Sequence, residues 1–130
     1  IKLHLPANLP QVLADSDMIR RVVINLLENA VKYTPSNLAI DIGATVEDSF
    51  VRISIRDHGA GIAENDRLRI FDKFVRLSPG RSYKGMGLGL AFCRLAIDAH
   101  GGRIWVENAP EGGAQFLFTL PVAPQQTDEK

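Results

Sequence analysis

The sequence lacks the features that mark disulfide-rich, membrane-spanning and nucleic-acid-binding proteins. Its single cysteine, Cys93, cannot form an internal disulfide, and no group of cysteines and histidines has the spacing of a zinc site. No apolar run reaches the length of a membrane span, and no signal-peptide pattern opens the chain. Fifteen basic and fifteen acidic residues leave no formal net charge, which argues against nucleic acid as a partner.

What remains is the profile of one ordinary globular domain. The chain has 130 residues, of which 45% are hydrophobic, enough for a single core. We expect residues 1–121 to form the domain and residues 122–130 to be a polar, disordered tail. The first residue is Ile1 and not methionine, so we expect a longer parent protein. Cys93 is expected to be a small core residue; a reactive thiol is the alternative.

Hydrophobic periodicity and turn residues predict alternating helices and strands. Paired largely antiparallel, with the helices on one face, the strands would form a two-layer α+β sandwich. The last helix is expected to bury an apolar stripe of Leu88, Phe92, Leu95, Ala96 and Ala99. The predicted elements are strands at 2–5 and 11–14, a helix from Asp15 or Ser16 to just before Pro35, strands at 38–46 and 50–57, a helix at 64–71, a loop at 76–86, a helix at 88–99, and strands at 103–108 and 115–120.

The segment 25–33 carries an unusual set of polar residues on a predicted helix. Asn25 and Asn29 are four residues apart and therefore share one helical face, with Lys32 and Tyr33 one turn further on. Asparagine is a mediocre helix former, so two on one face require a reason. One reading is a solvated polar face; the other is a site for a magnesium-bound nucleotide.

Two glycine-containing motifs favour the interpretation as a nucleotide site. In 57–62, an acid stands at a strand end with Gly59 and Gly61 behind it, where Asp57 could accept a hydrogen bond from an exocyclic amine; a simple tight turn is the alternative. The second motif, 85–90, opens a helix whose N–H groups suit phosphates. The P-loop pattern fails because Met86 follows the second glycine, and the dinucleotide fingerprint lacks its third glycine.

The order of these motifs resembles a known family. Asn-x-x-x-Asn-Ala-x-Lys-Tyr-Thr-Pro, Asp-x-Gly-x-Gly-Ile, Ile-Phe-x-x-Phe, Gly-x-Gly-Leu-Gly-Leu and His-Gly-Gly-x-Ile are similar to the N, G1, F and G2 boxes and following hairpin of the catalytic, ATP-binding domain of two-component sensor histidine kinases. The resemblance covers residues 1 to about 120. It implies the Bergerat ATP-binding fold, a two-layer α/β sandwich with a mixed, mostly antiparallel sheet, shared with gyrase, chaperone and mismatch-repair ATPases.

The resemblance also implies residue roles in binding ATP and Mg²⁺. Asp57 would recognise the adenine amine, and Asn29, helped by Asn25, would bind the metal. Lys84 and Met86 depart from the usual G2 box, and His58 stands where the family commonly has asparagine. The remaining implied contacts are Gly59, Gly61 and Ile62 around adenine, Lys32 at the phosphates, Tyr33 at adenine or ribose, Phe71 and Phe74 anchoring the lid, Arg76, Arg81 and Lys84 reaching phosphates from the lid, and Gly85, Gly87, Leu88, Gly89 and Leu90 along the triphosphate.

Phosphoryl transfer is the favoured activity. Related hydrolytic ATPases have a glutamate base at the position of Asn25, and an amide cannot take a proton from water. Glu28 lies about 300° from Asn25 around the helix. The family's phosphate-accepting histidine sits on a helical hairpin before the ATP domain, and His4, His58 and His100 lack that setting.

We therefore expect a protein-histidine kinase domain that cannot phosphorylate itself, with no catalytic acid or base of its own. Its partners would be the missing dimerisation and phosphoacceptor domain and, indirectly, a response regulator. The isolated domain is expected to be monomeric, cytoplasmic and without membrane contact, although the parent could be anchored in the inner membrane. The alternatives are an anti-sigma-factor serine kinase on the same fold, a degenerate scaffold, and, least favoured, a gyrase-like ATPase.

Overall fold

The computed structural model describes residues 2–7, 9–33, 39–59, 61–67, 70–71, 86–110 and 112–123. Within them the chain forms helices and strands in the order expected for a two-layer sandwich. They are β1 (Lys2–His4), α1 (Ser16–Tyr33), β2 (Asp41–Glu47), β3 (Phe50–Arg56), α2 (Glu64–Arg67), α3 (Met86–Ala99), β4 (Ile104–Asn108) and β5 (Ala114–Pro121).

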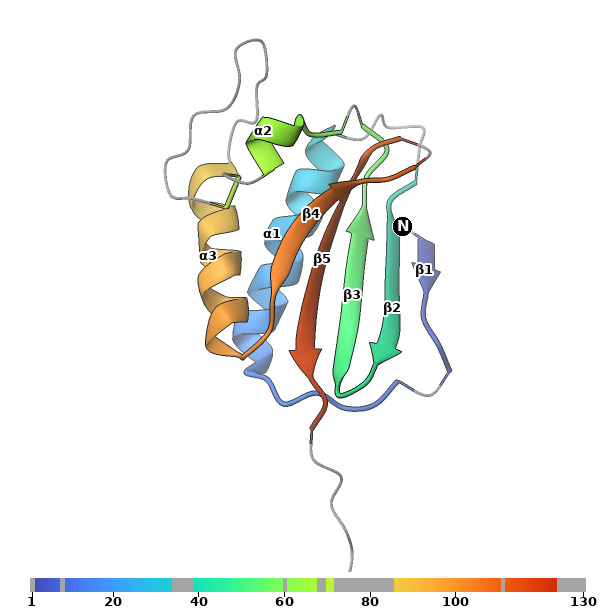
Figure 1. Ribbon diagram of the computed structural model, residues 1–130, viewed down its shortest axis with the longest axis vertical. Helices are drawn as coiled ribbons and strands as arrows, with labels where there is room; N and C mark the ends of the chain where they lie inside the picture. The colour runs from blue at the N-terminus through green and yellow to red at the C-terminus, as the bar shows by residue number, and fades with distance from the viewer. Residues whose placement is uncertain are drawn as a thin grey trace, which may run out of the picture.

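The strands build one mixed sheet in the order β1-β2-β3-β5-β4. β1 runs parallel to β2, and the pairs β2–β3, β3–β5 and β4–β5 are antiparallel. Helices α1 and α3 lie side by side on one face of this sheet (Figure 1). The predicted fold class, a two-layer sandwich with a mostly antiparallel sheet and helices on one face, is therefore confirmed.

Helix α1 begins and ends where the sequence indicates. The Oδ1 atom of Asp15 accepts hydrogen bonds from the backbone N–H groups of Asp17 and Met18, both at 3.0 Å. This is the bonding of an N-cap, which satisfies donors that the first helical turn leaves open. The helix ends at Tyr33, two residues before Pro35, as the restriction on the residue preceding a proline predicts.

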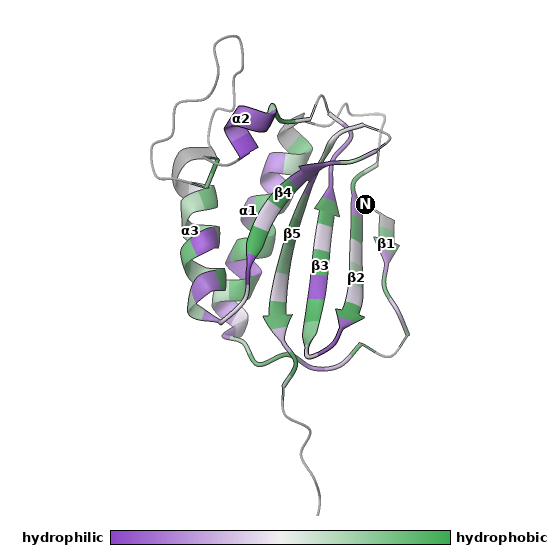
Figure 2. Ribbon diagram, viewed as in Figure 1, coloured by the Kyte–Doolittle hydropathy of each residue, from purple (hydrophilic) through white to green (hydrophobic). Residues whose placement is uncertain are grey.

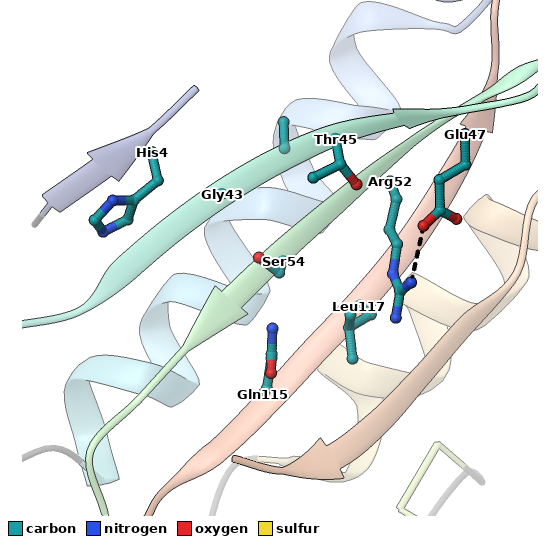
Figure 3. Close-up of a pocket in the computed structure, with 9 residues that line it drawn as sticks. His4, Gly43, Thr45, Glu47, Arg52, Ser54, Gln115 and Leu117 are labelled. Atoms are coloured by element: carbon teal, nitrogen blue, oxygen red, sulfur yellow. Dashed lines mark hydrogen bonds and ion pairs between the residues drawn. The ribbon is translucent and has the colours of Figure 1, made fainter. Parts of the chain in front are cut away.

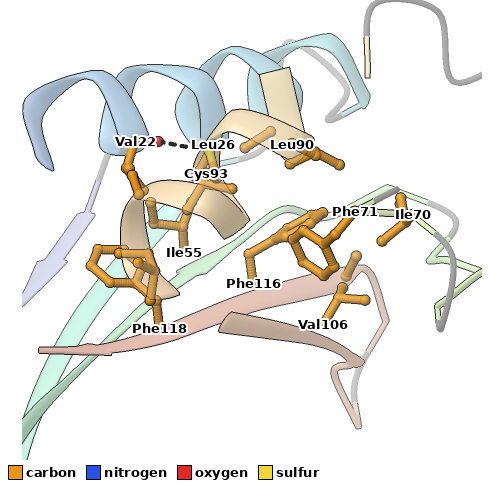
Figure 4. Packing of buried hydrophobic residues seen from close by; sticks show 14 of the residues in the cluster. Val22, Leu26, Ile55, Ile70, Phe71, Leu90, Cys93, Val106, Phe116 and Phe118 are labelled. Carbon is orange, nitrogen blue, oxygen red and sulfur yellow. Dashed lines mark hydrogen bonds between the residues drawn. The ribbon is translucent and has the colours of Figure 1, made fainter. Parts of the chain in front are cut away.

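The core lies between the sheet and the two long helices. Val22 and Leu26 of α1 and Leu90 of α3 are fully buried against sheet residues such as Phe118 (Figure 4). Apolar side chains from α1, α3 and the sheet therefore form one contiguous cluster. Cys93 is also fully buried, so the expectation of a core cysteine is confirmed.

The opposite face of the sheet is covered by its own side chains. Arg52 lies over the Trp105 ring, with 5.2 Å between the guanidinium carbon and the ring centroid, and forms an ion pair with Glu47 at 3.1 Å. Beside this pair is a hollow of about 340 Å³, lined by residues that include His4 and Gly43 (Figure 3). Long side chains laid across the sheet partly cover this face.

The predicted strand at 11–14 is wrong. Val12 forms only an isolated bridge to Val122, with backbone bonds from Leu13 N to Pro121 O at 3.1 Å and from Ala123 N to Gln11 O at 2.8 Å. Leu13 is 63% exposed, whereas Val12 and Ala14 are partly buried against the core, so the segment packs on the domain without pairing along a neighbouring strand. These contacts hold residues 11–13 beside the end of β5.

The predicted apolar stripe of α3 is also wrong in part. Leu95 is 67% exposed and Ala99 is exposed, whereas Cys93, Ala96 and Ile97 are buried. Most described residues of α3 are hydrophobic (Figure 2), so periodicity alone could not select the buried face. Contacts with α1 and with the sheet select it instead.

The other predicted elements differ mainly in their ends. The helix expected at 64–71 is observed only at Glu64–Arg67, while Ile70 and Phe71 lie in a turn and are buried. Helix α3 begins at Met86, two residues before the predicted start. It ends before Gly101, whose φ of 77° is the left-handed conformation of a helix C-terminus. The predicted loop lies outside the described residues except for Met86.

Candidate nucleotide site

Three segments that carry the sequence motifs lie at one end of the sandwich. The C-terminal end of α1, the end of β3 and the N-terminal end of α3 all lie at this end (Figure 1). They carry the three motifs that the sequence singled out, at Asn25 and Asn29, at Asp57, and at the glycines before Leu90. The topology explains the meeting, because α1 and β3 both run toward this end and α3 runs away from it.

Asp57 is a buried carboxylate held in one orientation. Its side chain belongs to a residue that is 4% exposed, and its Oδ1 atom accepts hydrogen bonds from the N–H groups of Gly59 and Ala114, both at 2.9 Å. The Asp57 N–H group donates to the Ala114 carbonyl, also at 2.9 Å. Within the described part of the chain, no group bonds the Oδ2 atom. A fixed carboxylate with one free oxygen can accept a hydrogen bond from an amine.

The turn after Asp57 is braced by a residue from β4. Gly61 has a φ of 83°, and Asn108 bonds the next residue twice, from Ile62 N to its Oδ1 atom at 2.9 Å and from its Nδ2 atom to Ile62 O at 3.0 Å. A Cβ at Gly61 would lie 2.9 Å from Asn108 Oδ1. Conformation and space both favour glycine here. Ile62 itself is buried in the core.

The two asparagines of α1 have different surroundings. Asn29 is 7% exposed, whereas Asn25 is half-buried. The Asn25 side-chain amide donates to the carbonyl oxygen of Gly89 on α3 at 3.3 Å. Asn25 is therefore already part of a helix–helix contact.

The contact between α1 and α3 also includes Cys93. Its thiol donates to the Val22 carbonyl at 3.7 Å. Burial raises the pKa of the Cys93 thiol to about 12, and a hydrogen bond with the Asn25 side chain opposes that rise. The thiol is therefore neutral at physiological pH, which excludes the reactive-thiol alternative for the folded state.

Helix α3 presents its N-terminal end to the same region. It is 14 residues long and begins at Met86, so its unpaired N–H groups and its dipole favour an anion there. Gly87, Leu88, Gly89 and Leu90 lie in its first turns. The structure does not describe the side chains of Met86 and Leu88 on α3, or those of Lys32 and Tyr33 on α1.

Several predicted contacts fall outside the described residues altogether. Phe74, Arg76, Arg81, Lys84 and Gly85 belong to this group, and their roles stay predictions. Phe71 is described, and its ring packs edge-to-face on Phe116 with 6.1 Å between centroids. In the described parts of the chain, no group of three or more His, Cys, Asp or Glu side chains could hold a metal ion.

Sequence reasoning missed three contributors to this site. Asn108 braces Ile62, and Gly113 lies so close to Asp57 that a Cβ there would overlap the Asp57 carbonyl oxygen. Asp41 bonds His58, the neighbour of Asp57, at 3.0 Å. The only sequence signal for any of them was the glycine pair in the β4–β5 turn. Pairing between distant strands creates the rest.

Comparison with known proteins identifies the family of the chain. Residues 14–124 match the family described as histidine kinase-, DNA gyrase B- and HSP90-like ATPases. The chain is 46% identical over 125 residues to the adaptive-response sensory kinase SasA of Nostoc sp. strain PCC 7120, covering 95% of the chain and 31% of that kinase. It is also 46% identical over 127 residues to the sensor protein KdpD of Escherichia coli K12, covering 98% of the chain and 14% of that protein.

Solved structures show the same likeness. The mycobacterial sensor histidine kinase MprB superposes with a TM-score of 0.82 at 30% identity, covering 95% of this chain and 85% of that chain. Full-length ShkA in complex with AMPPNP superposes with a TM-score of 0.81 at 34% identity, covering 97% of this chain and 26% of that chain. The chain therefore belongs to the histidine kinase-, DNA gyrase B- and HSP90-like ATPase family, as the catalytic domain found in sensor histidine kinases. It spans about a third of the length of SasA. Within the described residues, no helix combines the length and apolar character needed to cross a membrane.

Proposed function

We propose that this domain binds ATP with Mg²⁺ and donates the γ-phosphoryl group to a histidine on a separate dimerisation domain. The observation that carries the proposal is Asp57, a buried carboxylate whose Oδ1 atom is fixed by two backbone N–H groups at 2.9 Å. The fixed acid leaves its other oxygen for the adenine amine. Relatives that share this fold are sensory kinases, and one of them has been crystallised with an ATP analogue.

The donor set fits a nucleotide that brings its own metal. Mg²⁺ in phosphotransfer sites takes most of its ligands from phosphates and water, with one or two protein oxygens. Asn29 is 7% exposed and lies one turn beyond Asn25 toward the C-terminal end of α1, so its carbonyl oxygen is our first candidate ligand. Asn25 uses its amide nitrogen on Gly89, which leaves only its carbonyl oxygen as a second ligand. When bound, the metal would neutralise phosphate charge.

The same helix argues for transfer over hydrolysis. A hydrolytic enzyme needs a base that takes a proton from water, and loss of such a base lowers the rate by about 10²–10⁴-fold. Asn25 cannot act as that base. Glu28 is exposed and lies beside Ile24, Leu27 and Val31 on a different face of α1, away from the Asn25–Gly89 contact. The domain is then expected to hold ATP without rapidly consuming it.

The partners follow from the missing phosphoacceptor. His4, His58 and His100 all lie in or beside elements of this fold, with none on a helical hairpin. The acceptor histidine and dimerisation surface would lie on a preceding domain of the parent protein, which would then pass the phosphoryl group to a response regulator. We expect the isolated domain to be a monomer on the cytoplasmic side. The kinases named above favour this function over an anti-sigma-factor serine kinase.

Calorimetric titration with a non-hydrolysable ATP analogue, with and without Mg²⁺, tests the binding step. The sharpest variant is Asp57→Asn, which keeps an oxygen for the Gly59 and Ala114 N–H groups but turns an amide toward the adenine amine. We expect at least tenfold weaker binding, about 1.4 kcal/mol, with the fold intact by circular dichroism. Asp98→Asn, a change to an exposed carboxylate paired with Arg94 at 3.9 Å, is the matched control.

The metal and the transfer step have their own tests. Asn29→Ala should remove most of the gain in affinity that Mg²⁺ gives, while metal-free binding changes little; an undiminished gain would remove Asn29 from the metal site. Adding a helical-hairpin phosphoacceptor domain in trans with γ-labelled ATP should label its histidine. Rapid release of inorganic phosphate with no labelled histidine would instead indicate a hydrolytic ATPase.

A further inference from the structure

One carboxylate connects the N-terminal strand to the turn that carries Asp57. The Nε2 atom of His4 lies 3.1 Å from Oδ1 of Asp41, and the Nε2 atom of His58 lies 3.0 Å from Oδ2. An ionised carboxylate only accepts hydrogen bonds, so both imidazole nitrogens donate. His4 belongs to β1, Asp41 opens β2, and His58 follows β3. We call these three side chains the His-Asp-His bridge.

The bridge adds a side-chain link to the backbone pairing that attaches β1. This strand has three residues and pairs with β2 at the edge of the sheet, and so short an edge strand has few backbone bonds. His4 stands opposite Gly43 in the register. Because Gly43 has no side chain, the imidazole lies at a hollow of the open sheet face (Figure 3). It reaches back from there to Asp41.

At its other end the bridge acts on the nucleotide turn. His58 stands between Asp57 and Gly59, which are joined by the hydrogen bond from Gly59 N to Asp57 Oδ1 at 2.9 Å. The Asp57 side of the turn is held by Ala114, and the His58 side is held by Asp41. The His58 and Asp41 side chains are 25% and 23% exposed, so their bond is shielded more than that of His4, which is 62% exposed. A change at Asp41 therefore reaches the residue beside the adenine acceptor.

The bridge requires an ionised Asp41. Hydrogen bonds from His4 and His58 hold the pKa of Asp41 below its usual 3.8, so the carboxylate is ionised at neutral pH. It then accepts one hydrogen bond on each oxygen.

Neighbouring charged groups complete the surroundings of Asp41. Lys2 of β1 and Arg56 of β3 are its register partners. One Arg56 guanidinium nitrogen donates to the Gly112 carbonyl at 3.1 Å. Asp57, beyond Arg56, directs its Oδ1 atom to backbone N–H groups. Among the side chains that the structure describes, the His4 and His58 imidazoles are in hydrogen-bond contact with Asp41.

We propose that the His-Asp-His bridge is a positioning device through which strand β1 sets the position of the turn that binds adenine. Asp41, His4 and His58 are positioning residues that act through Asp57. The inference rests on the proposed nucleotide binding and adds a route by which the placement of β1 would influence affinity.

A double-mutant cycle with His4→Gln and Asp41→Asn tests this coupling. His4→Gln should weaken binding of the ATP analogue about threefold. In the Asp41→Asn background the same change should have no effect. Asp98→Asn is the control and should leave the effect of His4→Gln unchanged.

A nucleotide-free measurement separates failure of this inference from failure of the proposed function. In the backbone amide NMR spectrum, His4→Gln should shift the signals of His58 and Gly59, and Asp41→Asn should abolish that effect. Equal effects of His4→Gln in both backgrounds, or unmoved His58 and Gly59 signals, would overturn the inference even when nucleotide binds normally. If wild-type protein binds no nucleotide, the proposed function is wrong, and the amide signals alone decide whether the bridge positions the turn.

Discussion

The side-chain amide of Asn25 on α1 donates a hydrogen bond to the carbonyl oxygen of Gly89 on α3, 64 residues further along the chain, at 3.3 Å. The bond joins the asparagine pair to the second glycine motif, although the two motifs are far apart in the sequence. It holds helix α1, which carries the proposed metal ligands, against helix α3, whose N-terminus we propose to face the phosphates. A partly buried helix–helix contact therefore sets the relative position of two parts of the proposed site.

Removing this bond should destabilise the domain. Asn25→Ala is expected to lower the free energy of unfolding by about 1 kcal/mol, the usual net value of one hydrogen bond. Asn25→Asp should cost more, about 1–3 kcal/mol, because it sets a carboxylate against the Gly89 carbonyl without a donor. Urea unfolding followed by circular dichroism measures both. An aspartate variant as stable as wild type would mean that Asn25 does not point at Gly89.

Two glycines of the site should respond in opposite directions to alanine. At Gly113 the φ is 84° and a Cβ would overlap the Asp57 carbonyl oxygen, so Gly113→Ala should destabilise the domain by more than about 1 kcal/mol. At Gly89 a Cβ would lie 3.8 Å from Asn25 Cγ, an ordinary contact. Gly89→Ala should raise stability by up to about 1 kcal/mol through helix propensity. Thermal unfolding of the pair is the measurement, and equal effects would contradict the geometry.

The Cys93 thiol should be unreactive until the protein unfolds. Burial raises its pKa to about 12, and only the thiolate reacts with alkylating reagents. At pH 8 a thiol reagent should leave native protein unlabelled and label it fully in urea, which mass spectrometry resolves. Fast labelling under native conditions would show that α1 and α3 separate readily, because the thiol is buried between them at the Val22 carbonyl.

Acid should remove the stabilisation that Asp41 provides. Its pKa in the folded state is lowered, so its contribution is present above the unfolded-state value of about 3.9 and is lost as pH falls through the folded-state pKa. Wild type should exceed Asp41→Asn in free energy of unfolding by about 1 kcal/mol or less near pH 6, and the difference should diminish as pH falls below the unfolded-state pKa. Asp98→Asn serves as the control. A difference that persists in acid would have a cause other than ionisation.

Local signals in the sequence predicted much of the fold. Asp15 predicted the start of α1, Pro35 predicted its end, and Gly101 predicted the end of α3. These predictions succeeded because caps and helix breakers act within a few residues. The motifs also predicted which residues would gather, and the structure brings the three motif segments to one end of the sandwich (Figure 1). The prediction of a strand at 11–14 failed because short alternation does not by itself supply a neighbouring strand.

Periodicity failed where a helix is apolar on more than one side. The stripe that included Leu95 and Ala99 was plausible from spacing, yet Cys93 and Ile97 face the core. A helix between a sheet and another helix buries two sides, so its exposed strip is chosen by its neighbours. Sequence spacing holds no information about those neighbours.

By itself, the sequence determined the order of the elements, the class of the fold and the chemistry available to a ligand: an acid, two amides and a helix opening. Only the tertiary structure decided how these groups are used. In the folded domain the Asn25 amide donates to the Gly89 carbonyl, and Gly113 lies against the Asp57 carbonyl. Asp41 connects His4 to His58. The reason is physical: propensities and caps act between near neighbours, whereas these contacts join residues that only strand pairing and helix packing bring together.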